Sequence, residues 1–250
     1  MISATIIAQD EERDLPDCIA SVRGFCEEVI VVDGGSRDRT REIASSLGAR
    51  VIERPFDDFA RQHEFARTEA KGDWILSIDA DERASPELWR ELGVMSNPFD
   101  DEFSAYSLPF KNHFRGVWLR HGGFWPDPHV RLFRRDACRY DLSRAVHEKL
   151  IVDGIIDDLE SPILHYTYES LGDCLAKMSR YGERAAVTLH ASGRRAGPLD
   201  VALRPLWRFL RGYLVFGGFL DGAPGAAVAW ARAYEAYVKY ARLWELSHFS

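Results

Sequence analysis

The sequence predicts an α/β fold in which a mostly parallel central sheet is flanked by helices and followed by a helical C-terminal extension. Short apolar runs alternate with helical periodicities over the first hundred residues, and only helical patterns follow residue 168. Alternating strands and helices favour a parallel sheet with right-handed crossovers. The 250-residue chain is long enough for such a domain and an appendage, and its apolar fraction of 46% is typical of folded proteins.

Four strands and four helices are expected in the first hundred residues. The strands are short runs of aliphatic and β-branched residues, as in sheets that are buried on both faces. The helices repeat apolar residues at spacings of three and four, as between Leu15 and Val22. Ser36 is a candidate N-cap for the second helix, and Gly48 suits the position after its end. The expected strands are 4–8, 29–32, 51–52 and 74–78, and the expected helices begin near 15 and 40 and span 59–70 and 86–95.

The pattern changes after residue 100. Short strands separated by Gly, Pro and aromatic residues are expected at 105–111, 117–120, 129–133 and 151–152. A helix is expected at 168–190, with Leu171, Leu175, Met178 and Tyr181 on one face, and two more at 199–216 and 226–246. We therefore divide the chain into two halves of one domain, 1–100 and 101–167, and a helical extension, 168–250.

Charge and composition restrict the class of protein. The net charge of −7 argues against nucleic-acid binding. The segment 192–250 nevertheless carries eight Lys or Arg against four acids, which indicates contact with an anionic surface. The four cysteines lack metal-ligand spacing and are expected to be buried and reduced. No cationic leader and no apolar run of about 18 residues is present, so we expect a cytoplasmic protein that is at most peripheral on a membrane.

Carboxylates follow three of the predicted strands. They are the triplet 10–12, Asp33, and the pair Asp79 and Asp81. Because ligands of parallel sheets bind at the carboxyl ends of the strands, we expect these groups to converge. Asp79 and Asp81 have the hard oxygen ligands that Mg²⁺ or Mn²⁺ prefers. Asp33 either accepts the N–H of a pyrimidine base or caps the next helix, and the triplet either lines a nucleotide or opens a helix.

Three segments carry a family resemblance. They are residues 6–12 (IIAQDEE), 31–40 (VVDGGSRDRT) and 72–82 (GDWILSIDADE), in that order and at the usual spacing. Together they strongly resemble the family 2 glycosyltransferases, inverting enzymes with the glycosyltransferase A fold and its Rossmann-like sheet. The resemblance implies a nucleoside-diphosphate sugar as donor, UDP-sugar favoured, and Mg²⁺ or Mn²⁺ as cofactor. It makes 1–100 the nucleotide-sugar-binding half and 101–167 the acceptor-binding half of the domain. It implies that Ala8, Asp10, Glu11, Asp33, Asp79 and Ala80 bind the nucleotide sugar and that Asp81, with Asp79, binds the metal.

The sequence departs from the family pattern at two places. Ala8 and Asp10 replace the usual Thr and Asn of the first motif. In the segment 60–66, His63 and Glu64 stand where relatives have Arg and Asn, and we expect Arg61 to supply the cationic contact to the diphosphate.

Shorter motifs in the second half resemble the bacterial subgroup that adds glucose to the lipopolysaccharide inner core. They are 131–135 (RLFRR), 146–148 (VHE), 165–166 (HY) and 208–213 (RFLRGY). This resemblance implies transfer of glucose from UDP-glucose to a lipopolysaccharide core or a related cell-envelope glycan. Glu148 is the candidate catalytic base. His165 is either a further metal ligand or a buried histidine, and Arg131, Arg134 and Arg135 bind phosphate or form a solvated strand face.

Two other functions fit parts of the pattern. A nucleotidyltransferase shares the sheet and the metal carboxylates, but its first loop is usually glycine-rich and cationic, whereas residues 8–12 are acidic. A protein that binds nucleotide sugars or glycans without catalysis is the other alternative.

The C-terminal tail has its own two interpretations. Arg204, Arg208 and Arg211 recur at helical spacing among apolar and aromatic residues, which favours a helix lying on an anionic membrane. Alternatively, the tail helices pack on the catalytic domain and complete its core.

Overall fold

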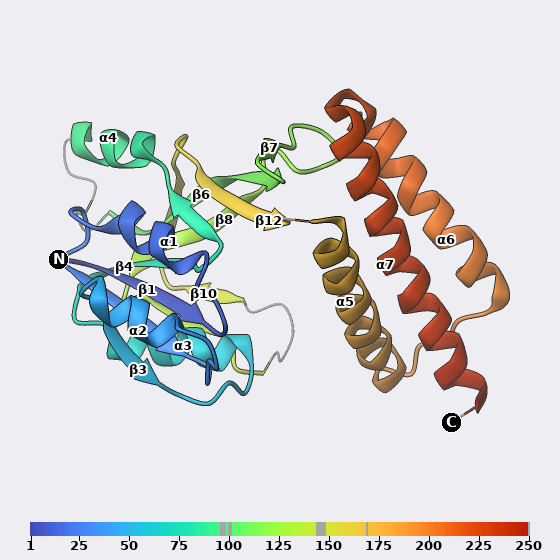
Figure 1. Ribbon diagram of the computed structural model, residues 1–250, viewed down its shortest axis with the longest axis horizontal. Coiled ribbons are helices and arrows are strands. Elements are labelled where there is room, and N and C mark those ends of the chain that lie inside the picture. Colours follow the sequence, from blue (N-terminus) through green and yellow to red (C-terminus); the bar gives the residue numbers. More distant parts are fainter. Residues whose placement is uncertain (96–98, 100–101, 144–148, 169, 250) are drawn as a thin grey trace. The chain divides into compact units, whose positions relative to one another are not determined.

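The computed structural model describes residues 1–95, 99, 102–143, 149–168 and 170–249. The chain divides into two compact units, which we treat separately. The first comprises Met1–Phe110 and Pro128–His165, and the second comprises Lys111–Asp127 and Tyr166–Ser250. Figure 1 shows the helices and strands of both units and labels many of them.

Four parallel strands form the base of the first unit. They are β1 (Ile2–Ala8), β2 (Glu28–Asp33), β3 (Arg50–Glu53) and β4 (Trp74–Asp79), in the spatial order β3-β2-β1-β4. Helices α1 (Leu15–Val22), α2 (Thr40–Ser46) and α3 (Phe59–Glu69) connect them, and α4 (Pro86–Val94) follows. The predicted α/β alternation is therefore confirmed, and the carboxyl ends of these strands share one edge.

Antiparallel strands extend this sheet beyond β4. The order continues through β8 (Pro128–Arg134), β6 (Phe103–Phe114), β12 (Ile163–Tyr168) and β5 (Glu82–Ala84). Two short strands also pair with β6, β7 (Val117–Trp118) antiparallel and β11 (Ile155–Asp158) parallel. β9 (Cys138–Tyr140) and β10 (Leu150–Val152) form a separate ribbon. Two pairings bear on the site, because β8 lies against β4 and β12 brings His165 opposite Glu82.

Alternation along the strands divides the core of the first unit between two faces. Successive residues of a strand point to opposite sides. Val31 of β2 packs with α1, α2 and α4 on one side, whereas Ile30 and Val32 pack on the other side with Ala66 of α3 and Tyr140 of β9. Both faces are covered, which explains why the strands read as apolar runs rather than alternating patterns.

The second unit is dominated by helices. They are α5 (Leu171–Ala191), α6 (Pro198–Leu210), the π-helical turn η1 (Arg211–Val215), the 3₁₀ turn η2 (Gly218–Asp221) and α7 (Gly222–Phe249). α7 packs against both α5 and α6. Phe114, Leu119 and Phe124 from the segment 111–127 pack onto Met178 and Val228 of these helices.

Three local expectations were wrong. The buried face of α5 is Cys174, Met178, Gly182 and Ala186, at a spacing of four, and Tyr168 ends a strand instead of opening this helix. Of the stripe that we expected, only Met178 is buried, because small residues are needed where α5 meets α7. Ser36 does not cap α2, which begins at Thr40. The four cysteines are buried and free, as expected.

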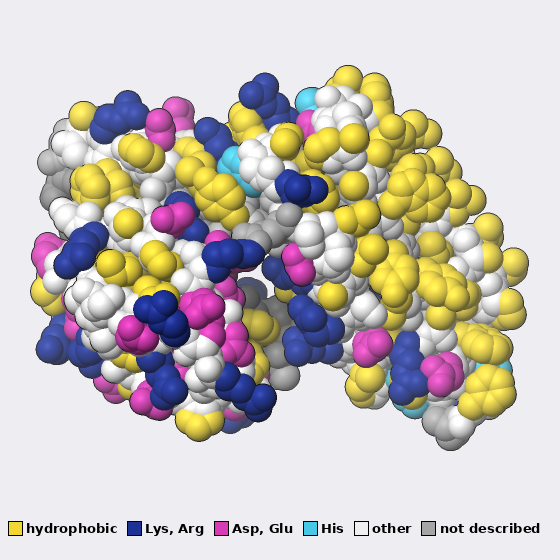
Figure 2. All heavy atoms as spheres, in the orientation of Figure 1, with side chains coloured by type: hydrophobic (Ala, Val, Ile, Leu, Met, Phe, Trp, Pro, Cys, Tyr) yellow, Lys and Arg dark blue, Asp and Glu magenta, His cyan; other side chains and the backbone are white. Residues whose placement is uncertain are grey.

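The surface of the second unit is unusually apolar over α6 and α7. Figure 2 shows hydrophobic side chains gathered over these two helices. Leu203 and Trp207 of α6 are 56% and 60% exposed, and Trp230 of α7 is 62% exposed. Among the described residues, no single helix has the length and composition to cross a membrane. The segments Pro198–Val215 and Gly218–Phe249 meet these two criteria only when they are taken together, and the chain bends by 72° between them.

The contact between α5 and α7 makes Gly182 a sensitive position. A Cβ atom there would lie 2.8 Å from the backbone oxygen of Glu235 in α7. We expect Gly182→Ala to lower the free energy of unfolding by about 1–3 kcal/mol, the usual cost of overpacking. Denaturant melts would measure it. Gly172→Ala in the same helix is the control, because its Cβ would meet only Ser170 Oγ at 3.6 Å; equal losses in both variants would contradict the packing argument.

Candidate active site

Asp79 occupies the carboxyl end of β4 and is the centre of the site. Its Oδ2 accepts a hydrogen bond from Arg131 Nη2 at 2.9 Å, and its Oδ1 lies 3.7 Å from His63 Nε2. Oδ1 is buried and has no hydrogen-bond partner within the described residues. Burial opposes ionisation, but Arg131 and then His63 outweigh it and hold the pKa of Asp79 well below its ordinary value.

Arg131 joins this carboxylate to a second one. The same Nη2 also donates to Glu82 Oε1 at 2.7 Å, and the guanidinium lies 5.2 Å from the centre of the Phe110 ring. The antiparallel pairing of β8 with β4 brings Arg131 to this end of the sheet. Arg131 was expected either to bind phosphate or to lie on a solvated strand face; in the structure it is largely buried and pairs with Asp79 and Glu82.

Glu82 is fully enclosed in the first unit. Its side chain is 1% exposed, and its Oε2 accepts the backbone N–H of Asp79 at 2.9 Å. Burial raises the pKa of Glu82 to about 8; Arg131 opposes this shift, while the charges of Asp79 and Asp81 add to it. Glu82 therefore fixes the turn 79–82 from within, with both of its oxygens engaged.

Asp81 and His165 lie together on the accessible side of the same turn. His165 Nε2 is 3.4 Å from Asp81 Oδ2, and ligand atoms of Asp81, Glu82 and His165 lie within 4.8 Å of one another. The set of carboxylate oxygen and imidazole nitrogen suits Mn²⁺, and its carboxylates suit Mg²⁺. With Asp79 Oδ1 lacking a hydrogen-bond partner in the described structure, the donor set fits a divalent ion.

His63 supports the cluster from α3. It is almost fully buried, its ring stacks on Tyr140 at 5.2 Å, and Ser77 Oγ lies 3.4 Å from its Nδ1. Tyr140 in turn donates its hydroxyl to Ser77 at 3.1 Å. The departure from the family pattern at His63 thus places a titratable ring directly behind Asp79.

Asp33, at the end of β2, holds a turn instead of facing an open pocket. Its side chain is 0% exposed, and its Oδ2 accepts the backbone N–H groups of Gly35 and Ser36, each at 3.0 Å. Its Oδ1 accepts the hydroxyl of Ser36. Of the two interpretations of Asp33, this geometry is nearer to the capping one, although the capped element is a turn.

Two loops are joined along the same edge of the sheet. Asp10 Oδ1 accepts the N–H of Arg37 at 2.7 Å, and the N–H of Asp10 donates to Ser36 Oγ at 2.9 Å. The N–H of Glu11 donates to Thr40 Oγ1 at 2.8 Å. Ala8 accepts the N–H of Gly34 at 2.8 Å. The acidic triplet is therefore a structural clasp between the β1 and β2 loops, whose outer side remains accessible.

The structure brings some predicted residues together and leaves others apart. Ala80 joins the cluster through its carbonyl, which accepts from Arg83 at 2.8 Å. Arg61 is an exposed residue of α3 that pairs with Asp58 at 3.0 Å. Arg134 and Arg135 lie toward the other end of β4, where they donate to the carbonyls of Phe103, Phe99 and Ala70. Glu148 lies outside the described residues.

Sequence reasoning missed Glu82 and the role of Arg131. Glu82 follows the Asp79–Asp81 motif directly, and a carboxylate at that position reads as one more solvated acid. The pairing of Arg131 depends on β8 lying beside β4, which no local pattern specifies.

The ion pairs of Arg131 make it a test of the cluster. Arg131→Met leaves Asp79 and Glu82 without their shared cation, and breaking a buried pair costs about 3–5 kcal/mol. We expect a loss of that order in denaturant melts, partly recovered by adding Glu82→Gln. Arg139→Met is the control, because its pair with Asp153 is exposed and worth at most about 1 kcal/mol. A double variant no more stable than Arg131→Met would refute the shared-charge explanation.

Known proteins were compared with the chain. The family model described as "Glycosyl transferase family 2" matches residues 3–141. An "uncharacterized glycosyltransferase" of Rickettsia bellii is 30% identical over 98% of this chain and 87% of its own length. The lipopolysaccharide core biosynthesis glycosyltransferase LpsC of Rhizobium meliloti is 29% identical, with 96% of this chain and 93% of its own covered.

Among solved structures, glucosyl-3-phosphoglycerate synthase of Mycobacterium tuberculosis, in complex with Mn²⁺, UDP and phosphoglyceric acid, aligns with a TM-score of 0.48 at 19% identity. The alignment covers 76% of this chain and 78% of that one. The family match extends over more than half of the chain and includes the three strand-end motifs. The chain belongs to glycosyl transferase family 2.

Proposed function

We propose that the protein transfers a sugar from a nucleoside diphosphate to a glycan hydroxyl with inversion at the anomeric carbon. The observation that carries this proposal is the meeting of Asp79, Asp81 and His165 at the carboxyl edge of the parallel strands. Asp79 Oδ1 is buried there without a hydrogen-bond partner among the described residues, so this oxygen is available to a ligand. A metal ion or a ribose hydroxyl supplies that missing partner.

The donor is proposed to lie along the edge formed by the β1 and β2 loops. Ala8, Asp10 and Glu11 line this edge, and Asp33 shapes the turn beside which the base would stack. UDP-glucose is the first donor to test, because the motifs 131–135 and 208–213 resemble those of glucose-adding enzymes.

A divalent ion would be held by Asp81 and His165, with Asp79 beside it. When bound, it would neutralise the charge that develops on the departing diphosphate. The protein's own part is to keep these ligands in place. Arg131 and Glu82 lock the backbone and side chain of Asp79, and His63 closes the rear of the site.

The transfer itself is a single displacement. The acceptor oxygen forms a bond to C1 of the sugar while the bond from C1 to the diphosphate oxygen breaks, and the acceptor proton passes to a carboxylate base. Glu148 is our proposal for that base. One displacement at C1 inverts its configuration.

The acceptor is proposed to be a lipopolysaccharide core or a related cell-envelope glycan. Support comes from the relative LpsC, whose name places it in lipopolysaccharide core biosynthesis and which aligns with 96% of this chain.

We further propose that the second unit rests on the cytoplasmic face of the inner membrane through the apolar face of α6 and α7. Arg204 lies 4.7 Å from the Tyr240 ring of α7, so its guanidinium is held against that helix. Leu203 and Trp207 are half-exposed or more on the apolar face. An acceptor anchored in lipid would meet the enzyme at such a surface.

Asp81→Asn should remove activity while leaving the fold intact. Turnover of UDP-glucose with Mn²⁺ is expected to fall at least about 10²-fold, because the diphosphate then leaves unneutralised. Isothermal titration calorimetry with Mn²⁺ alone should show that the variant also binds the metal more weakly. Asp158→Asn, an exposed acid on β11, is the control. Near-wild-type turnover in Asp81→Asn would contradict the proposal that Asp81 binds the metal.

Glu148→Gln should lower kcat by about 10²–10⁴-fold, the usual contribution of a positioned general base. Donor affinity, measured by titration of UDP with Mn²⁺, should stay within a factor of two to three because the base faces the acceptor. A collapse of donor affinity would move Glu148 into the donor site, and Asp127 or Asp141 would become the candidate base.

Leu203→Glu combined with Trp207→Glu should release the protein from membranes. Both changes put charge on the exposed apolar face, and each charge inserted at an interface opposes partitioning. Co-sedimentation with anionic vesicles measures the bound fraction. Val187→Glu on α5, also exposed, is the control. If the wild-type protein does not pellet with the vesicles, the proposed membrane contact of α6 and α7 is contradicted and these helices have a structural role only.

A further inference from the structure

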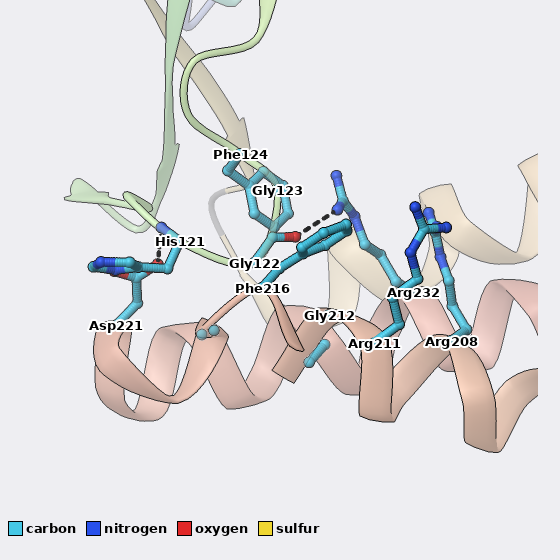
Figure 3. A pocket seen from close by; sticks show the side chains of 13 residues that line it. His121, Gly122, Gly123, Phe124, Arg208, Arg211, Gly212, Phe216, Asp221 and Arg232 are labelled. Carbon is cyan, nitrogen blue, oxygen red and sulfur yellow. Dashed lines mark hydrogen bonds and ion pairs between the residues drawn. The ribbon is translucent and has the colours of Figure 1, made fainter. Parts of the chain in front are cut away.

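A cavity of about 270 Å³ lies wholly inside the second unit, on side chains that the transfer reaction does not use. Its walls come from α6, the π-helical turn, α7 and the loop 121–124. Figure 3 shows Arg208, Arg211 and Arg232 together at one end and the pair His121–Asp221 at the other. The volume approaches the lower limit of about 300 Å³ that small-molecule sites have.

Arg208, Arg211 and Arg232 bring three positive charges to this cavity. Within the described part of the chain, none of them forms an ion pair. Arg232 Nη1 donates to the carbonyl of Gly122 at 3.2 Å, and its guanidinium lies 3.8 Å from the centre of the Phe124 ring. Arg211 lies over Phe216 at 4.9 Å. Stacking and a single carbonyl leave most of the guanidinium N–H groups available to a ligand.

The electrostatics of Arg232 point in the same direction. Burial, and next the charge of Arg208, lower the pKa of the Arg232 guanidinium, while Tyr168, Asp127 and Glu235 act in the opposite direction. Asp221 also lines the cavity, but both of its oxygens are engaged by His121, at 2.8 Å and 2.7 Å. Cations held together in this way repel each other until an anion lies between them.

The walls of this cavity are held in place without a ligand. His121 anchors the loop 121–124 to η2 through Asp221, and the N–H of Gly122 donates to the carbonyl of Phe216 at 2.8 Å. Gly122 and Gly123 have φ of 69° and 79°, which glycine adopts most easily. A π-helical turn begins at Arg211, and such turns are frequent at functional sites. The site is therefore preorganised.

The geometry points to a binding site for a phosphoryl group in this cavity, formed by Arg208, Arg211 and Arg232. Guanidinium groups bind phosphate oxygens in pairs of parallel hydrogen bonds, and a phosphate monoester brings the multiple negative charge that three arginines require. Arg208 and Arg211 are exposed and reach the ligand from solvent, whereas Arg232 lies deeper and is stacked.

Two molecules could present that group. Leu214, Val215 and Leu220 are more than half exposed next to the cavity, so the headgroup of an anionic lipid would have apolar surface for its chains. A phosphorylated sugar of a glycan acceptor carries the same group without the chains. This inference does not depend on the proposed transfer reaction, since binding is measured without donor or turnover.

The test uses the full-length protein and inorganic phosphate. Titration calorimetry and thermal melts are run at constant ionic strength, with chloride as the reference anion. We expect phosphate to bind and to raise the Tm of the wild type. Arg208→Gln and Arg211→Gln should each raise the Kd for phosphate about 10- to 100-fold, the usual effect of losing a charged hydrogen bond. Arg204→Gln is the matched control on the same helix, because Arg204 pairs with Asp200.

A second readout separates a ligand site from a structural cluster. Arg208→Gln removes a repulsive neighbour of Arg232, so without phosphate its Tm should equal or exceed that of the wild type. A lower Tm in the absence of ligand, together with an unchanged Kd for phosphate, would show that Arg208 supports the fold and would overturn the proposal. So would a wild type that does not distinguish phosphate from chloride.

Two further arms identify the source of the phosphoryl group. Vesicles of phosphatidylcholine are compared with vesicles that also contain phosphatidic acid, and glucose 6-phosphate is titrated in solution. A preference for phosphatidic acid that is lost in Arg208→Gln but kept in Arg204→Gln assigns the site to a lipid headgroup. Binding of glucose 6-phosphate that depends on Arg208, with no such lipid preference, assigns it to a phosphorylated glycan. If neither probe depends on Arg208, the phosphoryl site is refuted.

Discussion

The bridge from Arg131 to Asp79 and Glu82 is the interaction on which the active site depends. Two carboxyl groups meet at the end of β4 in largely buried surroundings, and the guanidinium of Arg131 lies between them. Without this cation the ionised Asp79 would lose its main charge partner. Arg131 reaches these carboxyl groups only because β8 runs antiparallel to β4. The antiparallel extension of the sheet thus supplies the positive charge that stabilises the carboxylate cluster at the end of the parallel strands.

That bridge also separates the roles of three neighbouring acids. Glu82, enclosed and with a raised pKa, holds the turn; Asp79, with a lowered pKa, stays ionised; Asp81 faces outward toward His165. Similar side chains within four residues thus differ in function because their burial and hydrogen bonding differ. The second unit shows the reverse arrangement, in which three cations gather without an acid between them and are accessible to a ligand.

The parallel half of the fold was predictable from sequence because its strands and helices are specified locally, by apolar runs and by three- and four-residue spacing. The position of Asp79 and Asp81 at a strand end followed from the same pattern. The partners of these residues were not predictable, because Arg131, His63 and Tyr140 reach the site through pairings between distant strands and helices. The stripe expected on α5 failed for a related reason, since helix-to-helix contact selected Gly182 and Ala186 over the larger residues.

The clasp between the β1 and β2 loops has a kinetic consequence. Asp10 adopts a left-handed backbone conformation, with φ of 58°, that a non-glycine residue seldom takes, and hydrogen bonds to Ser36 and Arg37 hold it there. The conformational entropy of this edge is therefore lost during folding and not when a ligand arrives. A nucleotide would meet a finished surface, so its association rate would be set by diffusion and charge rather than by the time that a loop needs to become ordered.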